Sequence, residues 1–495
     1  MPDISGLPEV FVSTAALAAS VSRQVKLGKL RKLGSRLYTR NLTEPPERLV
    51  QRHLWPLVDA YFPGALIADR TALENRPASD GSVFLIASKK RDIVLPGLVL
   101  RPRSGPPPLE SDRQFLATLR LSSPARAFLE NMRPSRSRST VARTLSRVQI
   151  EERLDELLRL SGDAALQRLR DQAREISQQL GLADEFLQLD ALIATLSGTR
   201  QAPLASPVAR ARAAGRPYDP HRLNLFQNLF SELAGAAPVT RFAHPSDGAA
   251  LPFFEAYFSN FIEGTEFAVD EAADIIFRGQ IPKARPADAH DVLGTWKIVS
   301  DQREMSRLPA SFEELAGLLK SRHATILPGR PDQRPGRFKE EANRAGSTLF
   351  VAPDLVEGTL AQGYEVYRGL SSPLQRAIFL MFLVAEVHPF SAGNGRLARV
   401  MMNAELVAAG EQRIIVPTVY RLNYLMALKA LSQNQIPGAL VRTMEFAQRY
   451  TASIDFSDWA RARAMLTETH AFADPHEAEA AGLRLTMPQV ERGSA

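Results

Sequence analysis

The fold of this chain is decided by the stretch Ala377-Ile-Phe-Leu-Met-Phe-Leu-Val-Ala-Glu-Val-His-Pro-Phe-Ser-Ala-Gly-Asn-Gly-Arg-Leu-Ala-Arg399. Its apolar first half predicts a buried helix that runs into His388 and is stopped by Pro389. The Gly-Asn-Gly triplet at 393–395 predicts a tight turn, after which Arg396 opens a second helix. We therefore expect two helices joined by a short loop that begins at the histidine.

This loop combines three kinds of group that suit phosphate chemistry. The turn would present backbone N–H groups at a helix N-terminus, which favours a phosphate anion. Arg396 and Arg399 are three residues apart and share one face of the second helix. His388, facing the same pocket, could take a proton from an attacking hydroxyl. The pattern predicts a base, an anion cradle and two arginines that clamp phosphates.

Two common phosphate-binding patterns do not account for the loop. Residues 393–398 match a loose dinucleotide fingerprint, but that fingerprint follows a strand, whereas this segment follows a helix. The chain contains no Gly-Lys-Ser/Thr, which excludes a Walker loop. For the fragment Gly-Asn-Gly-Arg alone, a capped helix-turn-helix with a buried histidine and surface arginines is the structural alternative.

The whole segment resembles the signature of the Fic family, His-Pro-Phe-x-(Asp/Glu)-Gly-Asn-Gly-Arg-x-x-Arg, and every specified position except the acidic one is present. The resemblance implies transfer of AMP from ATP to a Ser, Thr or Tyr hydroxyl of a target protein. It implies that His388 is the base that activates this hydroxyl. The residues that it assigns to the nucleotide phosphates are Gly393, Asn394, Gly395, Arg396 and, for the terminal phosphate of ATP, Arg399.

Ala392 is the departure from this signature. In the family, the acidic side chain at this position helps to hold the Mg²⁺ that bridges the α- and β-phosphates. An alanine side chain has no oxygen to offer a hard cation, so we predict no metal ligand here and impaired metal-assisted transfer. A natural variant that uses another donor, a degenerate enzyme and an engineered knockout remain open as explanations.

A helix end upstream of the loop carries a second pattern. Ser259 and Glu263 are four residues apart and share a helix face, and Gly264 is a natural helix terminator. Beside the loop, this otherwise ordinary helix end resembles the inhibitory pattern Ser/Thr-x-x-x-Glu-Gly/Asn of self-inhibited Fic proteins. The resemblance implies that Glu263 pairs with Arg399 and blocks productive placement of ATP within the same chain.

Two short strands around a turn are expected over residues 335–339 and 347–353. They resemble the family's flap, a hairpin that holds the target segment by strand pairing beside the histidine. After the loop, Tyr424 lies on the helix that in relatives lines the adenine side, so its ring is expected to stack on the base, with a core position as the alternative. The residues assigned to the flap are Arg337, Phe338 and Lys339.

The N-terminal part is basic, since residues 10–42 contain no acidic side chain. A helix is expected to begin near Ser13, a second helix after Ser20 and Ser22, and a short wing over residues 34–38. This predicts a winged helix-turn-helix that binds DNA, with a solvated basic helix as the alternative. The predicted DNA-binding residues are Arg23, Lys26, Lys29, Arg31, Lys32 and Arg36.

Residues 12–105 resemble, at the level of pattern, the N-terminal part of AbiEi-type antitoxins, in which a winged helix precedes a compact α/β unit. The likeness lies in residues 32–38, 65–73 and 94–98. It implies DNA binding in a toxin–antitoxin or phage-defence setting. Basic side chains would supply mostly phosphate contacts, which set affinity rather than sequence choice.

Composition narrows the function classes. Hydrophobic residues make up 45% of the chain and charged residues 23%, as in a soluble globular protein. Cysteine is absent, which excludes disulfides, thiolate catalysis and cysteine zinc sites. The net charge of +7 permits an anionic partner but identifies none. The N-terminus lacks signal-peptide character and the longest apolar stretch is too short to span a bilayer, so a cytoplasmic protein without membrane contact is expected.

The sequence therefore predicts a multidomain, mainly α-helical protein with a Fic helical core and a β-hairpin flap. Its predicted activity is self-inhibited AMP transfer from ATP, with Mg²⁺ in doubt, together with DNA binding. The alternatives are a DNA-binding regulator with an impaired core, favoured by Ala392, and removal of AMP with Glu263 orienting a water. Relatives that dimerise imply a homodimer.

The expected parts are a winged-helix and α/β unit (1–105), a helical connector (109–198), a linker (199–222), the Fic domain with its inhibitory helix (223–455) and a C-terminal tail (456–495).

Overall fold

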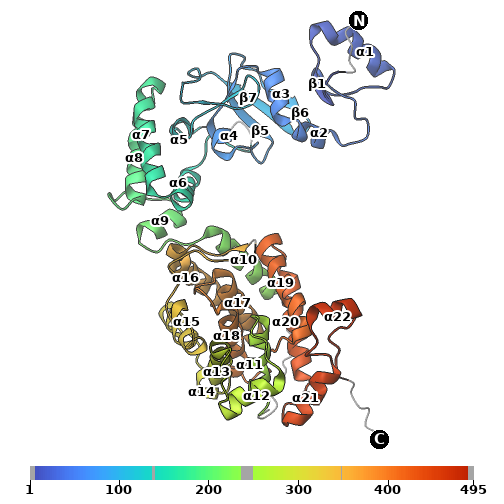
Figure 1. The fold of residues 1–495 in the computed structure, drawn as a ribbon. Helices are drawn as coiled ribbons and strands as arrows, with labels where there is room; N and C mark the ends of the chain where they lie inside the picture. Colours follow the sequence, from blue (N-terminus) through green and yellow to red (C-terminus); the bar gives the residue numbers. More distant parts are fainter. Residues whose placement is uncertain (1–5, 136–139, 236–248, 347, 489–495) are drawn as a thin grey trace. The chain divides into compact units, whose positions relative to one another are not determined.

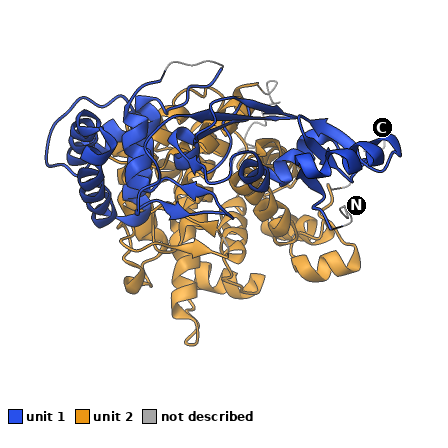
Figure 2. Ribbon diagram, turned by 90° about the horizontal axis from the view of Figure 1, so that it is seen from above, with its two compact units in different colours: residues 1–215 blue, residues 216–495 orange. Residues whose placement is uncertain are grey.

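The computed structural model describes residues 6–135, 140–235, 249–346 and 348–488. The chain divides into two compact units, residues 1–215 and 216–495 (Figure 1; Figure 2). Helices account for 57% of the structure, and strands lie mainly near the N-terminus, which confirms the predicted mainly helical, multidomain architecture.

Unit 1 combines small sheets with a helical end. Its elements are β1 (Val10–Val12), η1 (Ala15–Leu17), α1 (Ala18–Lys26), β2 (Arg31–Gly34), β3 (Leu37–Thr39), α2 (Pro46–Arg52), α3 (Leu54–Tyr61), β4 (Leu66–Ile67), α4 (Asp69–Glu74), β5 (Ser82–Ile86), β6 (Ile93–Leu95), β7 (Leu98–Arg103), β8 (Arg113–Gln114), β9 (Arg120–Leu121), α5 (Pro124–Met132), α6 (Arg147–Ser161), α7 (Asp163–Leu180), α8 (Ala183–Leu196) and α9 (Pro207–Ala213).

Two sheets organise the first part of unit 1. Strands β1, β3 and β2 form an antiparallel sheet in that order. A mixed sheet has the order β6-β7-β5-β4-β9-β8, with parallel pairing of β5 to β7 and of β4 to β9. Apolar side chains of both sheets, such as Leu37 and Leu100, pack with Leu49 and Val58 of α2 and α3 in one core.

The helical part of unit 1 has a core of its own, built from α5 to α9. Helix α6 begins with a capping box in which the Ser146 hydroxyl accepts a hydrogen bond from the Gln149 backbone N–H. The predicted helical stretch 150–180 is divided at Gly162, whose φ of +75° ends α6 and starts α7.

Unit 2 is almost entirely helical. Its elements are α10 (Pro220–Gly235), α11 (Leu251–Ile262), α12 (Val269–Arg278), α13 (Pro286–Val299), α14 (Gln302–Met305), α15 (Phe312–Ile326), η2 (Pro331–Gln333), β10 (Arg344–Ala345), β11 (Thr348–Leu349), η3 (Pro353–Leu355), α16 (Val356–Tyr367), α17 (Pro373–Val387), α18 (Asn394–Ala408), η4 (Thr418–Tyr420), α19 (Arg421–Asn434), α20 (Pro437–Ala452), α21 (Trp459–Glu468) and α22 (Pro475–Ala481).

Helix α17 lies in the middle of unit 2, beside α18 and surrounded by the other helices (Figure 1). Its residues 377–384 are all buried. A helix that is apolar on every side is stable only when other elements cover it all round, which explains its central position. Pro373 starts this helix at a position where a missing N–H costs nothing, and the helix ends at Val387, directly before the histidine.

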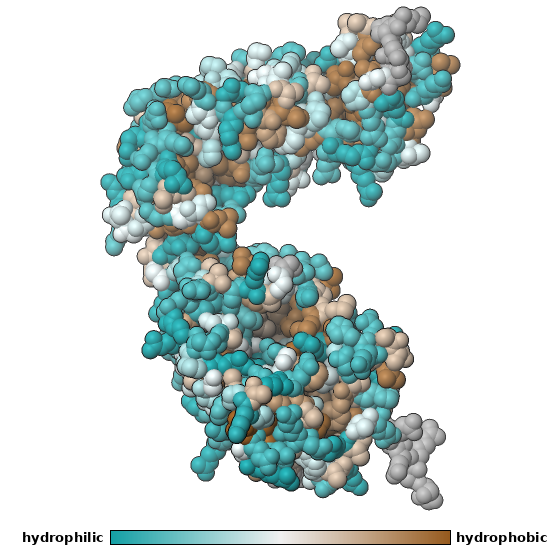
Figure 3. All heavy atoms as spheres, viewed as in Figure 1, coloured by the Kyte–Doolittle hydropathy of each residue, from teal (hydrophilic) through white to brown (hydrophobic). Residues whose placement is uncertain are grey.

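Hydrophilic side chains cover most of the face shown in Figure 3, with hydrophobic ones scattered among them. Among the described residues, no helix is both long and apolar enough to cross a membrane.

Candidate active site

The loop between α17 and α18 is bracketed by two residues with left-handed backbone. His388 has φ +52° and caps α17, and Gly393 has φ +73° and caps the start of α18. The Asn394 side chain closes the loop, because its Oδ1 accepts from the Phe390 N–H at 2.9 Å and its Nδ2 donates to the Phe390 carbonyl at 2.8 Å. Asn394, predicted to hold phosphate, therefore uses its side chain to shape the loop, while its backbone belongs to the first turn of α18.

His388 is held in the form that a general base requires. Its Nδ1 lies 3.2 Å from the carbonyl oxygen of Ala385, an acceptor, so Nδ1 carries the proton and Nε2 keeps its lone pair. Burial lowers the pKa of His388 to about 4, and the positive charge of Lys339 lowers it further, against the effects of the Ala385 carbonyl and Glu263. The imidazole is therefore neutral at pH 7. The ring stacks on Phe350, with 3.7 Å between the centroids and 8° between the planes.

Arg399 is buried and bound to the end of α11. Its Nε donates to the Ser259 hydroxyl at 3.0 Å, and its Nη2 donates to the Ser259 carbonyl at 2.7 Å and to Oε1 of Glu263 at 2.9 Å. Glu263 is the C-cap of α11, and Gly264, with φ +84°, turns the chain away behind it. The sequence-predicted pair of Glu263 with Arg399 forms in this way.

The Glu263 carboxylate sits at the predicted anion cradle. An ideal Cβ placed on Gly395 would come within 2.1 Å of Glu263 Oε1, so the carboxylate lies against the backbone of the first turn of α18. Burial alone would raise the pKa of Glu263, but Arg399 and Arg396 outweigh burial and the pKa is lowered. An ionised carboxylate thus lies where a helix N-terminus favours an anion.

Arg396 contacts groups that were not predicted from the sequence. Its Nη2 donates to the Thr265 hydroxyl at 3.0 Å and lies 3.1 Å from Oδ2 of Asp291 on α13. Its Nε is buried without a hydrogen-bond partner among the described residues. Both loop arginines are therefore in place beside the cradle, each paired with a carboxylate.

The residues at the position of the family's metal ligand do not fit Mg²⁺. The Ala392 side chain offers no oxygen, and its carbonyl accepts a hydrogen bond from Nε2 of His323 at 2.9 Å. His323 is fully buried, stacks on Phe390 and accepts from the Gly336 N–H through Nδ1 at 2.9 Å. Within the described ranges, no three histidine, aspartate or glutamate side chains come together as a metal site.

The flap prediction was partly wrong. The hairpin pairs β10 with β11, whereas residues 335–339 form a turn and an irregular segment because Gly336 adopts φ +79° three residues after the end of η2. Ser347, where the second predicted strand begins, lies outside the described residues. Of the described residues in the strand predicted over 347–353, Thr348–Leu349 forms a strand, and Pro353 begins the short helix η3.

The three predicted flap residues differ in their surroundings. Arg337 is exposed, and Phe338 packs on Phe390 with a centroid distance of 5.2 Å. Lys339 is buried under the loop, with its N–H donating to the Pro389 carbonyl at 2.9 Å and its Nζ to Asn343 Oδ1 at 2.7 Å. Burial lowers the pKa of Lys339 to about 8. The backbone N–H of Lys339 thus ties this segment to the loop.

Tyr424 has no exposed ring face for a base. Its side chain is 1% exposed, and the Arg399 guanidinium lies 5.8 Å from its ring centroid. Tyr424 thus occupies the core position that was the alternative for this residue, because α19 turns it into the core beneath Arg399, and stacking on adenine stays a prediction.

The N-terminal prediction of two helices is also wrong. Ala15–Leu17 forms a 3₁₀ turn that runs directly into α1, so Ser20 and Ser22 lie inside one helix. Arg31 is partly buried and donates to the carbonyls of Leu42 and Glu44, so it supports a loop. The exposed members of the predicted DNA-binding set are Arg23, Lys26, Lys29, Lys32 and Arg36.

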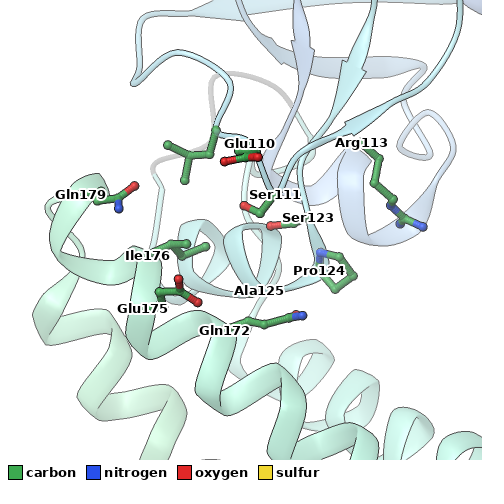
Figure 4. A pocket seen from close by; sticks show the side chains of 11 residues that line it. Glu110, Ser111, Arg113, Ser123, Pro124, Ala125, Gln172, Glu175, Ile176 and Gln179 are labelled. Carbon is green, nitrogen blue, oxygen red and sulfur yellow. The ribbon is translucent and has the colours of Figure 1, made fainter.

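A separate polar pocket of about 670 Å³ lies in unit 1 (Figure 4). Its walls come from the loop before β8, the start of α5 and one face of α7, and the labelled side chains include Glu110, Arg113, Ser123, Gln172 and Glu175. Acidic and basic side chains are mixed in its lining, so its charge favours no one class of ligand.

Sequence reasoning missed Asp291, Thr265, His323 and Phe350. Each of them lies in an ordinary helix or loop sequence and reaches the loop only through tertiary packing. Asp291 and His323 are polar residues at buried helix positions. Sequence alone does not reveal that these positions are buried, so it did not mark them.

Comparison with known proteins places a recognised domain around this loop. The Fic/DOC family profile matches residues 315–406. A Fido domain-containing protein of Dictyostelium discoideum is 39% identical over 80 residues, which cover 15% of this chain and 56% of the relative. Protein adenylyltransferase fic-1 of Caenorhabditis briggsae is 24% identical over 199 residues, or 38% of this chain and 39% of that protein.

The chain thus spans less than two thirds of each of these relatives. Among solved structures, a fragment of Fic-1 from Caenorhabditis elegans is similar with a TM-score of 0.36 and 17% identity, covering 65% of this chain and 94% of that one.

Proposed function

Residues 315–406 form a Fic/DOC domain, and from this premise we propose that the protein transfers AMP from ATP to a hydroxyl group of a target protein. The supporting observation is the meeting of three groups at one loop. They are a neutral histidine, a helix start that carries no side chain at Gly395, and two buried arginines, Arg396 and Arg399. The adenylyltransferase named among the relatives agrees with this chemistry.

In the proposed reaction, the target hydroxyl gives its proton to Nε2 of His388 as its oxygen attacks the α-phosphorus of ATP. A bond forms between this oxygen and the α-phosphorus, and the bond from the α-phosphorus to the bridging oxygen breaks, releasing pyrophosphate. Arg396 and Arg399, together with the N–H groups at the start of α18, stabilise the negative charge on the phosphates. A neutral His388 at pH 7 supports its role as the base.

The same proposal includes a built-in brake. Glu263 places its ionised carboxylate against Gly395 and on Arg399, where the phosphates of ATP would bind. A nucleotide and this carboxylate would compete for one anion site. Activity therefore requires that Glu263 leave, and the unmodified chain should be nearly silent.

The test is incubation with α-³²P-labelled ATP and Mg²⁺, comparing the unmodified chain with Glu263→Gly, Ala392→Asp and the double variant. Each is matched by a form that also carries His388→Ala. Label on protein in the double variant that disappears with His388→Ala is the expected result. Label already present in Glu263→Gly alone would mean that Ala392 is tolerated. If no variant transfers label to itself or to proteins of a cell extract, AMP transfer from ATP is disproved.

A second candidate is removal of AMP, with Glu263 orienting a water molecule. The position of Glu263 beside His388, close enough to influence its pKa, supports this possibility. One substitution distinguishes the two activities, because Glu263→Gly should raise AMP transfer but abolish AMP removal. Release of AMP from a pre-labelled protein by the unmodified chain is the measurement.

A third candidate is a DNA-binding regulator whose core is impaired. It is supported by the exposed basic side chains of the N-terminal sheet and helix and by the missing oxygen at Ala392. Fluorescence anisotropy with short duplex DNA tests it. We expect Lys26→Glu combined with Lys29→Glu to weaken binding and to flatten its salt dependence, since each lost phosphate contact reduces the slope by about one. Binding that is unchanged by both substitutions would exclude this surface.

A further inference from the structure

Each arginine of the loop is paired with a carboxylate from a different helix. Glu263, at the end of α11, pairs with Arg399, as the family resemblance implies. Asp291, in the middle of α13, pairs with Arg396, with 3.1 Å between Oδ2 and Nη2. Nothing in the sequence singled out Asp291, and its contact is with a residue that we assign to the phosphates.

We propose that Asp291 is a positioning residue for Arg396. It holds the Nη2 end of the guanidinium and leaves the Nε–H free for a phosphate oxygen of the nucleotide. The inference rests on the proposed function, because it takes Arg396 to be a phosphate ligand.

The state of Arg396 itself supports this role. The residue is 5% exposed, and its Nη2 is engaged by both Asp291 and the Thr265 hydroxyl. Its Nε is buried and has no partner among the described residues. A buried donor without a partner is unfavourable, and an incoming anion would satisfy it. The guanidinium is therefore tethered at one atom and unsatisfied at another.

Asp291 has a second arginine partner. Its side chain is fully buried, and the Arg330 Nε donates to the same Oδ2 atom at 2.9 Å. Arg330 also donates through Nη2 to Oδ1 of Asp288 at 2.6 Å. Asp288, Arg330, Asp291 and Arg396 thus form a row of alternating charge. Since every member touches an opposite charge, the row restricts the orientation of Arg396.

Asp291 differs from Glu263 in what it covers. The atoms nearest to an ideal Cβ on Gly395 all belong to Glu263, so Glu263 occupies the cradle. Asp291 approaches Arg396 from α13, so it should stay in place when Glu263 leaves. Removing Glu263 should therefore free the anion site, whereas removing Asp291 should loosen one of the groups that builds it.

A double-mutant cycle on nucleotide binding tests the proposal. The background is full-length Glu263→Gly, in which Asp291→Asn, Arg396→Ala and their combination are compared by calorimetric titration with ADP and with ATP in Mg²⁺. We expect Asp291→Asn to weaken ADP binding about tenfold. The same substitution should have no further effect once Arg396 is alanine, because the group that it positions is gone.

Glu405→Gln is the matched control. Like Asp291, Glu405 is a buried carboxylate of unit 2 that pairs with an arginine, Arg376, at 3.0 Å. It should lower the melting temperature but leave ADP affinity unchanged. If Asp291→Asn does not fold, Arg330→Gln takes its place. This variant keeps the carboxylate but removes its support, and should weaken binding in the same Arg396-dependent way.

Unchanged or tighter ADP binding in Asp291→Asn would overturn the proposal, as would equal losses with and without Arg396. In those cases the proposed transferase function would still stand, since Glu263→Gly binds nucleotide. If Glu263→Gly binds neither ADP nor ATP, the proposed function fails and the role of Asp291 fails with it.

Discussion

Gly395 and Glu263 are in such close contact that an ideal Cβ on the glycine would lie 2.1 Å from Oε1 of the glutamate. The glycine does not need a left-handed backbone here, because it lies within the first turn of α18. Its bare backbone is what allows an anion to approach the helix start. The same lack of a side chain serves both the carboxylate now in place and the phosphate that we expect to replace it.

Gly395→Ala should therefore destabilise the unmodified chain but not Glu263→Gly. In the first case the new methyl group displaces Glu263 from Arg399 and leaves the buried guanidinium without its carboxylate, which costs about 1–3 kcal/mol of unfolding free energy. In the second case the space is empty and alanine is the better helix former. Urea unfolding of the four proteins measures the difference. Equal effects in both backgrounds would mean that the carboxylate does not rest on this glycine in solution.

The acid limb of the proposed transfer reaction should lie far below neutrality. The pKa of His388 is lowered to about 4, so the base is neutral and competent from pH 8 down to about pH 5 and becomes protonated only near pH 4. Rates of label transfer by the Glu263→Gly, Ala392→Asp variant should stay flat between pH 8 and 6. NMR titration of ¹³C-labelled histidine, with His388→Ala to assign the signal, gives the pKa directly. A midpoint near the ordinary value of 6.5 would contradict this expectation.

Lys339→Met should stabilise the protein at pH 7. Burial lowers the pKa of Lys339 from 10.5 to about 8, so its charged form is disfavoured in the folded state. Between pH 8 and 10.5 the unfolded chain binds more protons than the folded one, and stability rises with pH in that window. We expect Lys339→Met to be more stable by about 1–3 kcal/mol at pH 7, with a smaller gap at pH 10. Chemical unfolding at both pH values tests this. If the difference in unfolding free energy between the two proteins does not narrow at pH 10, titration of Lys339 is excluded as the cause of the difference.

His323 should make the loop sensitive to acid. Burial lowers the pKa of His323 from 6.5 to about 4, so the unfolded chain binds more protons between these values and stability falls as the pH drops from 6.5 to 4. His323 lowers the free energy of unfolding by about 3 kcal/mol at most over this pH range. His323→Phe keeps a ring against Phe390 and removes this effect, although the hydrogen bonds to Gly336 and Ala392 are lost. Unfolding free energies at several pH values, with His388→Ala as the comparison for the second buried histidine, should show a shallower acid slope in His323→Phe.

The parts of the site that sequence could predict depend on residues close together in the chain. His388, the Gly-Asn-Gly turn and the spacing of Arg396 and Arg399 all lie in one loop and the turn of helix behind it. The pairing of Glu263 with Arg399 was accessible for a similar reason, since the four-residue spacing from Ser259 and the terminator Gly264 define a helix end. Local spacing fixes which side chains share a face, and the resemblance then supplied the partner.

The rest depends on contacts that local spacing does not encode. Asp291 and His323 lie far from the loop in sequence, and only the packing of α13 and α15 brings them to it. The strand predicted over 335–339 failed because Gly336 adopts a left-handed turn there. Tyr424 illustrates the limit of face assignment, because periodicity identified a helix but not which helix would cover its ring.

Each unit of the chain contains hydrophobic cores of its own. Those of unit 2 are built from residues between Leu225 and Ala471, and the two largest of unit 1 from residues between Val10 and Ala209. A fragment that starts after Gly215 would keep every core residue that supports the loop and should fold by itself. In evolutionary terms, a unit with cores of its own can be joined to a different partner unit without redesign of its interior.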